Sequence, residues 1–178
     1  TQWASDSSQP PVMQYVQHKG ARVPALGFGT FPMRGAQCTR AVLWALEAGY
    51  RHIDTAQLYG NEADVGAALV QSGLSRADIF VTTKCGVYDA SPEAVQAELV
   101  ESLDRLQTDY VDLWMYHWPN RDTPLAETLA ALADARTAGL VRQVGVGNFT
   151  IPLLHEAVEV HGADLFSNQF ENHPLLRQ

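Results

Sequence analysis

The sequence predicts an α/β protein of the (β/α)8 barrel type, and three observations lead to this prediction. Short apolar segments with strand character alternate with longer segments whose apolar residues recur every three or four positions. Strands that alternate with helices pair in parallel, because each helix returns the chain to the edge where the previous strand began. The G-x-G-x-x-G motif of an open dinucleotide-binding sheet is missing after the first strand, since Pro32 occupies the third glycine position.

The order of the elements follows from this alternation. A hairpin is predicted over residues 13–26, with its turn at Lys19 and Gly20. Strands are predicted at residues 25–29, 52–54, 79–84, 111–117, 144–147 and 165–168. Helices are predicted at residues 38–48, 62–72, 92–106, 124–138 and 152–160. Capping residues are expected at Ser91, Thr123 and Thr150, and glycines that end helices at Gly49, Gly73, Gly139 and Gly162.

Composition limits the classes of function. The net charge of −8 and the pI near 5.1 argue against nucleic acid or an anionic membrane as the main partner. No apolar run approaches the length of a membrane span. Cys38 and Cys85 lack metal-ligand spacing and are expected to be free thiols, which favours the cytoplasm. Residues 1–12 are interpreted as a disordered lead or an expression remnant, and residues 13–178 as one barrel domain.

Polar residues occur where successive predicted strands end. Asp54, Lys84, His117 and Asn148 follow one another at intervals of about 30 residues, one βα unit each. Equivalent ends of barrel strands share one rim, and in barrel enzymes that rim carries the chemistry. Each residue also has an ordinary structural explanation: Asp54 could cap a turn, Lys84 could extend to solvent, and His117 could be a buried core histidine.

Tyr59 lies in the loop just after Asp54 and is the candidate proton donor. A phenol with a pKa near 10 is a poor acid at neutral pH. A nearby ammonium such as Lys84, kept charged by Asp54, is expected to lower the pKa of Tyr59 by stabilising the phenolate. Simple packing of a half-buried tyrosine is the alternative interpretation.

Five segments together resemble the aldo-keto reductase family. They are GYRHIDTAQLYGNE at 49–62, TTK at 82–84, DYVDLWMYHWP at 109–119, VGVGNF at 144–149 and NQFENHP at 168–174. Residues 148–152 are also similar to the bacterial 2,5-diketo-D-gluconate and methylglyoxal reductase branch. The resemblance implies a TIM barrel that transfers hydride from NADPH to a small carbonyl substrate, in an enzyme that is monomeric in its full-length form.

The resemblance also implies roles for individual residues. Asp54, Tyr59, Lys84 and His117 would form the catalytic tetrad. Thr30, Asp54, Asn148 and Gln169 would contact the cofactor, and Phe31 and Trp118 would line the carbonyl pocket. The family usually has serine where Gly147 stands, which removes one expected contact to nicotinamide. About six of the eight βα units are present, so the resemblance implies an incomplete barrel with little activity by itself.

Two other functions are compatible with parts of the pattern. A metal-dependent barrel hydrolase could use His52, Asp54 and His117 as ligands, because His52 and Asp54 share a strand face. Lys84 argues against this, since it would bring a positive charge to the metal. The second alternative is a barrel that binds the nicotinamide cofactor without catalysing turnover.

Overall fold

Strands and helices alternate along the chain after an N-terminal hairpin. The computed structural model describes residues 13–85, 92–120 and 122–176. Its strands are β1 (Tyr15–His18), β2 (Ala21–Pro24), β3 (Phe28–Gly29), β4 (His52–Asp54), β5 (Phe80–Cys85), β6 (Val111–Tyr116), β7 (Val141–Gly147) and β8 (Asn168–Gln169). Its helices are α1 (Gly35–Glu47), η1 (Gln57–Tyr59), α2 (Glu62–Gln71), η2 (Arg76–Asp78), α3 (Pro92–Leu106), α4 (Leu125–Thr137), α5 (Ile151–His155) and η3 (Glu156–Val160).

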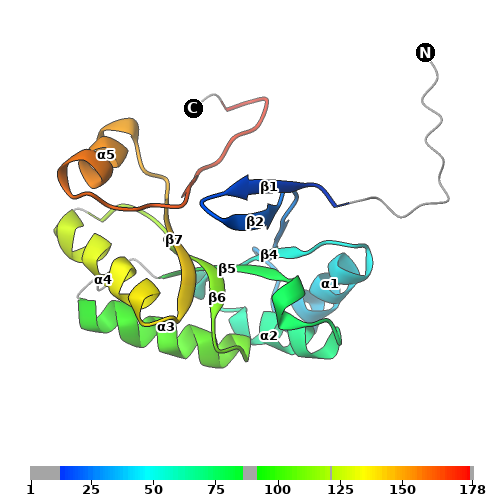
Figure 1. Cartoon of the computed structure of the whole chain (residues 1–178). Helices are drawn as coiled ribbons and strands as arrows, with labels where there is room; N and C mark the ends of the chain where they lie inside the picture. Colours follow the sequence, from blue (N-terminus) through cyan, green and yellow to red (C-terminus); the bar gives the residue numbers. More distant parts are fainter. Residues whose placement is uncertain (1–12, 86–91, 121, 177–178) are drawn as a thin grey trace, which may run out of the picture.

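The central sheet has the order β3-β4-β5-β6-β7-β8, and all of its strand pairs are parallel. It curls into a half-barrel, with helices α1–α4 along the outer side and the β1–β2 hairpin on the other side (Figure 1). Each strand therefore neighbours the next strand in sequence, as in a (β/α)8 barrel. The predicted fold class is confirmed for the six strands of this sheet.

Most predicted elements lie close to the observed ones. The strand predicted at 52–54 and the helix predicted at 92–106 have the observed bounds. The hairpin turns at Lys19 and Gly20, which both adopt positive φ angles. The four glycines expected to end helices also have positive φ, because a residue without a Cβ reaches that conformation at little cost.

Several local predictions are wrong or only partly right. The strand predicted at 165–168 is only Asn168–Gln169, the strand predicted at 144–147 begins at Val141, and the helix predicted at 152–160 becomes a π-helix at Glu156. The first barrel strand begins at Phe28 and not at residue 25, because the Ala25 amide donates to the Gln14 carbonyl and extends the hairpin. Thr150 is the N-cap of α5, but its side chain makes no capping hydrogen bond. Pro124, not Thr123, is the N-cap of α4. The predictions for Ser91 and for residues 1–12 lie outside the described residues.

The two faces of the sheet carry different side chains, because side chains alternate along a strand. Ile53, Val81 and Trp114 point outward and belong to the main core, which they share with the helices. The inner face holds a smaller apolar cluster, against which the hairpin packs through Ala21 and Val23; its members are Phe80, Leu113, Met115 and Phe166. The hairpin therefore covers the apolar part of the inner face and leaves the rim polar.

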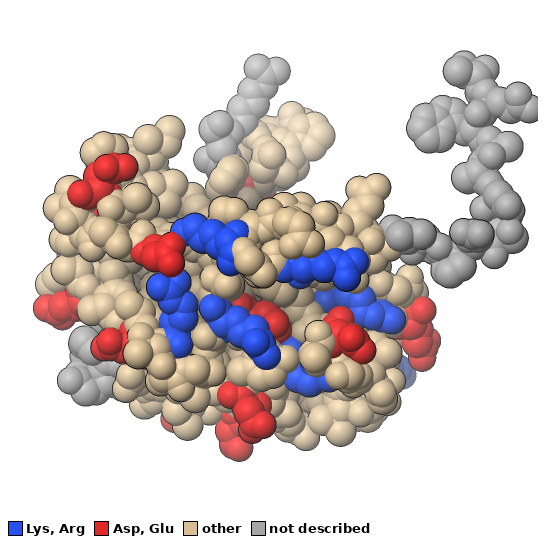
Figure 2. Space-filling view, in the orientation of Figure 1, with Lys and Arg blue, Asp and Glu red and all other residues tan. Residues whose placement is uncertain are grey.

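Ion pairs connect the elements at the beginnings of the strands. Asp112, near the start of β6, accepts from Arg76 at 2.9 Å and lies 3.7 Å from Arg142 of β7. Asp164 pairs with Lys19 of the hairpin and Arg136 of α4. Figure 2 shows basic and acidic side chains interspersed on this view of the surface. Several of the basic side chains thus have acidic partners within the chain.

Both cysteines are buried free thiols, as expected from the sequence. Burial raises the pKa of Cys38 to about 11 and that of Cys85 to about 12, so both stay protonated near neutral pH. Among the described residues, no helix combines the length and apolar character needed to cross a membrane.

Replacing Gly66 by alanine should destabilise the contact between α2 and α3. A Cβ at Gly66 would lie 2.4 Å from the Arg105 carbonyl oxygen and 2.8 Å from that of Leu106. These are backbone atoms, so a helix would have to move, and the free energy of unfolding should fall by ~1–3 kcal/mol in urea denaturation. Gly29→Ala is the control, since nothing lies within 4 Å of its added Cβ. Equal stability of the Gly66 variant and wild type would contradict this packing.

Candidate active site

The ends of four neighbouring strands bring the candidate residues to one rim. Asp54 is the last residue of β4, and Lys84 is the second-to-last residue of β5. His117 and Asn148 directly follow β6 and β7. The parallel register pairs Lys84 with Met115, two residues before His117, so the side chains share the inner face near the strand ends.

Lys84 is the deepest charged group of the rim and is 1% exposed. Its Nζ donates to Asp54 Oδ1 at 2.5 Å and to the Thr55 carbonyl oxygen at 2.9 Å. Burial lowers the pKa of Lys84, and the neighbouring Asp54 carboxylate opposes that effect. Asp54 uses its second oxygen to accept from Gln169 Nε2 at 2.8 Å, which connects β8 to β4.

Tyr59 lies at the end of η1, among aromatic rings and next to the buried ammonium. Its ring is 5.2 Å from that of Phe31 and 5.6 Å from that of His117, between ring centroids. Lys84 Nζ lies 5.3 Å from the centroid of the Tyr59 ring. Burial, and then Asp54, raise the pKa of Tyr59. The expectation of a lowered pKa is wrong for this state, because desolvation of the phenolate and its repulsion by the Asp54 carboxylate disfavour the charged form.

His117 is held in its neutral form. Burial and, secondarily, the Lys84 ammonium lower the pKa of His117 to about 4, although Asp54 acts in the opposite direction. Its Nδ1 is buried and has no hydrogen-bond partner within the described part of the chain. A neutral imidazole carries one N–H, which it can donate to a carbonyl oxygen.

The residues expected to contact a cofactor surround the same rim. Thr30 is fully buried, and its amide donates to the Asp54 carbonyl oxygen at 3.0 Å. Its hydroxyl oxygen is buried without a partner in the described residues. Asn148 Nδ2 donates to the His117 carbonyl oxygen at 3.1 Å, from a backbone with a φ of 60°. Gln169 reaches the rim through its bond to Asp54.

Gly147 departs from the family pattern for a steric reason. An added Cβ would lie 2.5 Å from the His117 carbonyl oxygen. The close approach of β7 to the end of β6 therefore requires glycine in this backbone arrangement. A serine at this position would need the two strand ends to separate.

Phe31 and Trp118 are exposed aromatic residues of the rim, at 67% and 51% exposure. The ring of Trp118 lies 6.4 Å from that of His117, between centroids. Asp54 and Gln169 also line an open cavity of about 510 Å³ between the hairpin and strands β3 and β4. Another cavity, of about 870 Å³, lies between α2 and α3 and is lined by none of these rim residues.

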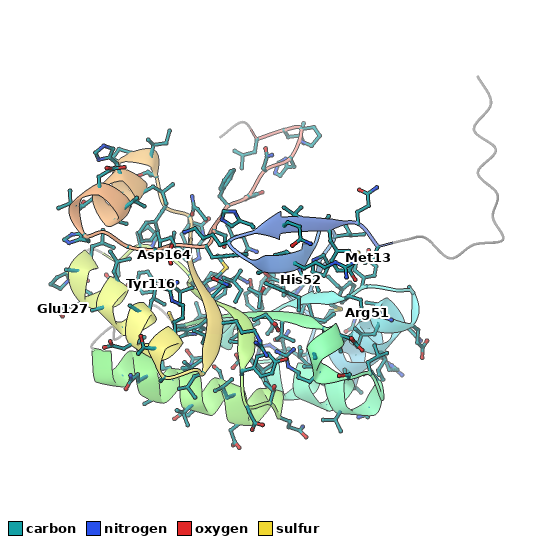
Figure 3. All side chains as sticks on the ribbon, in the orientation of Figure 1. Met13, Arg51, His52, Tyr116, Glu127 and Asp164 are labelled. Atoms are coloured by element: carbon teal, nitrogen blue, oxygen red, sulfur yellow. The ribbon has the colours of Figure 1, made fainter. Side chains whose placement is uncertain are left out.

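The ligand set for the alternative metal site is not assembled. Among the described residues, no three His, Cys, Asp or Glu side chains gather closely enough to hold a metal ion. His52, labelled in Figure 3, is instead hydrogen-bonded through Nε2 to Thr82 Oγ1 at 2.9 Å. The described residues thus give no support to the hydrolase alternative.

Two rim residues were not singled out by the sequence analysis. Asn61 and Thr55 are buried and hydrogen-bonded to each other, between Asn61 Oδ1 and Thr55 Oγ1, at 2.7 Å. No spacing signal distinguishes Asn61, because it lies directly before the helix predicted at 62–72, where a polar residue ordinarily serves as a cap. In the structure the Asn61 side chain makes no capping bond to α2.

Comparison with known proteins gives consistent matches. Residues 25–178 match the sequence model of the aldo/keto reductase family. Methylglyoxal reductase DkgB of Escherichia coli is 44% identical over 158 residues, which are 87% of this chain and 59% of the relative. The chain therefore spans about three fifths of that relative's length.

Solved structures match as well. A crystal structure of an aldo/keto reductase from Brucella melitensis has a TM-score of 0.88 and 40% identity, and covers 94% of this chain and 66% of that one. The aldo-keto reductase of Bombyx mori, solved in complex with NADP, has a TM-score of 0.83 and 33% identity. That match covers 90% of this chain and 58% of the Bombyx mori chain.

The free energy of unfolding should fall at acidic pH, because the His117 side chain binds a proton in the unfolded chain at a pH where the folded chain does not. The pKa of His117 is about 4 in the folded protein, against about 6.5 when unfolded. Between these values the unfolded chain binds the proton and the folded chain does not, so the free energy of unfolding decreases as the pH is lowered. Urea denaturation at about pH 7 and about pH 4.5 should show a smaller decrease for His117→Gln than for wild type.

The comparison with His117→Gln removes other contributions. Burial also lowers the pKa of His52, but that residue is unchanged in both proteins and its effect cancels. An equal decrease in stability for the variant and for wild type would show that the His117 imidazole is not desolvated as described.

Proposed function

Because this chain belongs to the aldo/keto reductase family, we propose that it forms the active site of an NADPH-dependent carbonyl reductase. The enzyme would reduce an aldehyde or ketone to an alcohol, with Tyr59 as the general acid. The observation that carries the proposal is the convergence of a phenol, a buried ammonium, a carboxylate and a neutral imidazole at one rim. The four groups belong to Tyr59, Lys84, Asp54 and His117, which lie in four different segments of the chain.

Several rim groups fit a bound nicotinamide cofactor. The buried hydroxyl of Thr30 has no partner among the described residues, and the amide of the same residue donates to the Asp54 carbonyl oxygen, so a polar ligand at this rim would give the hydroxyl a partner. Asn148 and Gln169 each use their Nδ2 or Nε2 group inside the protein. Their carboxamide oxygens would accept from the amide of nicotinamide. When bound, NADPH supplies the hydride that reduces the carbonyl carbon.

Tyr59 would deliver the proton to the carbonyl oxygen. Tyr59 is protonated at neutral pH, but because burial raises its pKa, proton transfer depends on stabilising the phenolate that forms. The Lys84 ammonium would stabilise the phenolate that forms as the proton leaves, which favours the transition state over the ground state. Asp54 keeps Lys84 charged through their direct bond.

His117 would orient the substrate. Its neutral ring can donate one N–H to the carbonyl oxygen, since its pKa lies well below neutral pH. The T-shaped contact between His117 and Tyr59 keeps the two donors on the same side of the site. Phe31 and Trp118 would form the apolar walls, because exposed aromatic faces cover a substrate without competing for hydrogen bonds.

We expect a small aldehyde or ketone as substrate. The Escherichia coli relative is named a methylglyoxal reductase, so methylglyoxal is a reasonable first compound to test. Two protonated, unpaired thiols fit a reducing compartment such as the cytoplasm. The net charge of −8 gives no reason to expect nucleic acid as a partner, and a full-length monomer remains our expectation.

Tyr59→Phe should remove the proton donor with little change of shape. In the protein expressed from the complete reading frame, turnover with methylglyoxal should fall by ~10²-fold or more. The dissociation constant for NADPH should change little, because the proposed cofactor contacts are untouched. Tyr110→Phe is the matched control, since Tyr110 stacks with Arg76 and Arg142 at the starts of the strands, away from the rim. Turnover that survives in Tyr59→Phe would exclude Tyr59 as the acid.

A further inference from the structure

We propose that Asn61 is a positioning residue of the active site, which holds the loops carrying Phe31, Tyr59 and the anchor of Lys84 in one arrangement. The inference rests on the proposed function, because it assigns Asn61 a role in that reaction. Asn61 touches none of the reacting groups directly. It acts through the backbone and side chains of three rim segments.

The Asn61 side chain makes three hydrogen bonds to other loops and is 1% exposed. Its Oδ1 accepts from Thr55 Oγ1 at 2.7 Å. Its Nδ2 donates to the Thr30 carbonyl oxygen at 3.2 Å and to the Met33 carbonyl oxygen at 2.9 Å. Both ends of the amide are used, so the side chain cannot rotate without leaving buried polar groups unpaired.

Each of these bonds leads to a residue of the site. The Thr55 carbonyl oxygen accepts from Lys84 Nζ at 2.9 Å. Holding Thr55 in place therefore also holds one of the two acceptors of the Lys84 ammonium. Thr30 and Met33 bracket Phe31, whose ring contacts that of Tyr59. Tyr59 itself lies two residues before Asn61, with Gly60 between them in a left-handed conformation.

A side chain is needed here because sheet pairing does little to fix these loops. Strand β3 contains only Phe28 and Gly29, and the segment after it has one further bond to the sheet among the described residues, from the Thr30 amide to the Asp54 carbonyl oxygen at 3.0 Å. The position of Asn61 is well defined because the next residue, Glu62, is held by buried hydrogen bonds. Glu62 is buried, and its Oε1 accepts from Thr83 at 2.5 Å while its Oε2 accepts from Arg105 at 2.9 Å. Both oxygens therefore keep a partner without the further bond from Ser102 to Oε2 at 3.1 Å.

The test compares Asn61→Ala with Ser102→Ala in the protein expressed from the complete reading frame. Both variants lose buried hydrogen bonds near α2, but within the described part of the chain the Ser102 side chain bonds to Glu62 and Arg105, which lie outside the rim loops. Asn61→Ala should lower kcat for methylglyoxal by ~10–100-fold, because displacement of about 1 Å at a reacting group has effects of this size. The KM for NADPH should stay within about threefold in both variants, and Ser102→Ala should keep its kcat.

A conservative pair of variants tests the connection through Thr55. Thr55→Ser retains the hydroxyl that Asn61 accepts and should retain most of kcat. Thr55→Val lacks that hydroxyl and should lower kcat in the same direction as Asn61→Ala. Combining Thr55→Val with Asn61→Ala should add little, since both changes remove the same bond.

Spectroscopic titration of Tyr59 gives a readout that does not need turnover. Subtracting the Tyr59→Phe titration isolates this tyrosine, and its pKa should move down towards the ordinary value of about 10 in Asn61→Ala as the loop loosens. No such shift is expected in Ser102→Ala. If wild type reduces no carbonyl compound, the proposed function fails, whereas the titration still tests Asn61. Equal effects of Asn61→Ala and Ser102→Ala on kcat or on the titration would overturn the positioning role.

Discussion

The ion pair between Lys84 and Asp54 is the interaction on which the rest of the rim depends. An ammonium that is 1% exposed loses its hydration, and such a loss costs several kcal/mol unless partners replace the water. Asp54 and the Thr55 carbonyl are those partners, and Gln169 holds the other Asp54 oxygen. A positive charge can therefore remain inside the half-barrel, beside the Tyr59 ring.

The fold tolerates this charge because stability and chemistry lie on different faces of the sheet. The outward side chains of β4–β6 join the helices in the main core, where each fully buried aliphatic side chain contributes ~1.5–3 kcal/mol. The inward positions at the strand ends are then free to carry polar groups. Burial at this rim raises the pKa of Tyr59 and lowers that of His117, so both side chains are neutral near pH 7.

The sequence predicted the alternation of strands and helices, and it placed three candidate residues at or next to the ends of strands. Asp54, Lys84 and His117 follow from strand spacing alone, because one βα unit separates each from the next. Contacts between loops could not be predicted in this way. The bonds of Asn61 to Thr30 and Met33 span about 30 residues without any periodic signal, and the raised pKa of Tyr59 depends on how deeply its ring is buried.

A double-mutant cycle on Asp54 and Lys84 tests the central claim most directly. The free energy of unfolding would be measured in urea for Asp54→Asn, Lys84→Met and the double variant. Each single change leaves a buried group without its partner, and should cost ~3–5 kcal/mol. We expect the double variant to lose less than the sum of the single losses, by ~1–3 kcal/mol. Losses that add within about 0.5 kcal/mol would contradict the ion pair as the organising interaction of the rim.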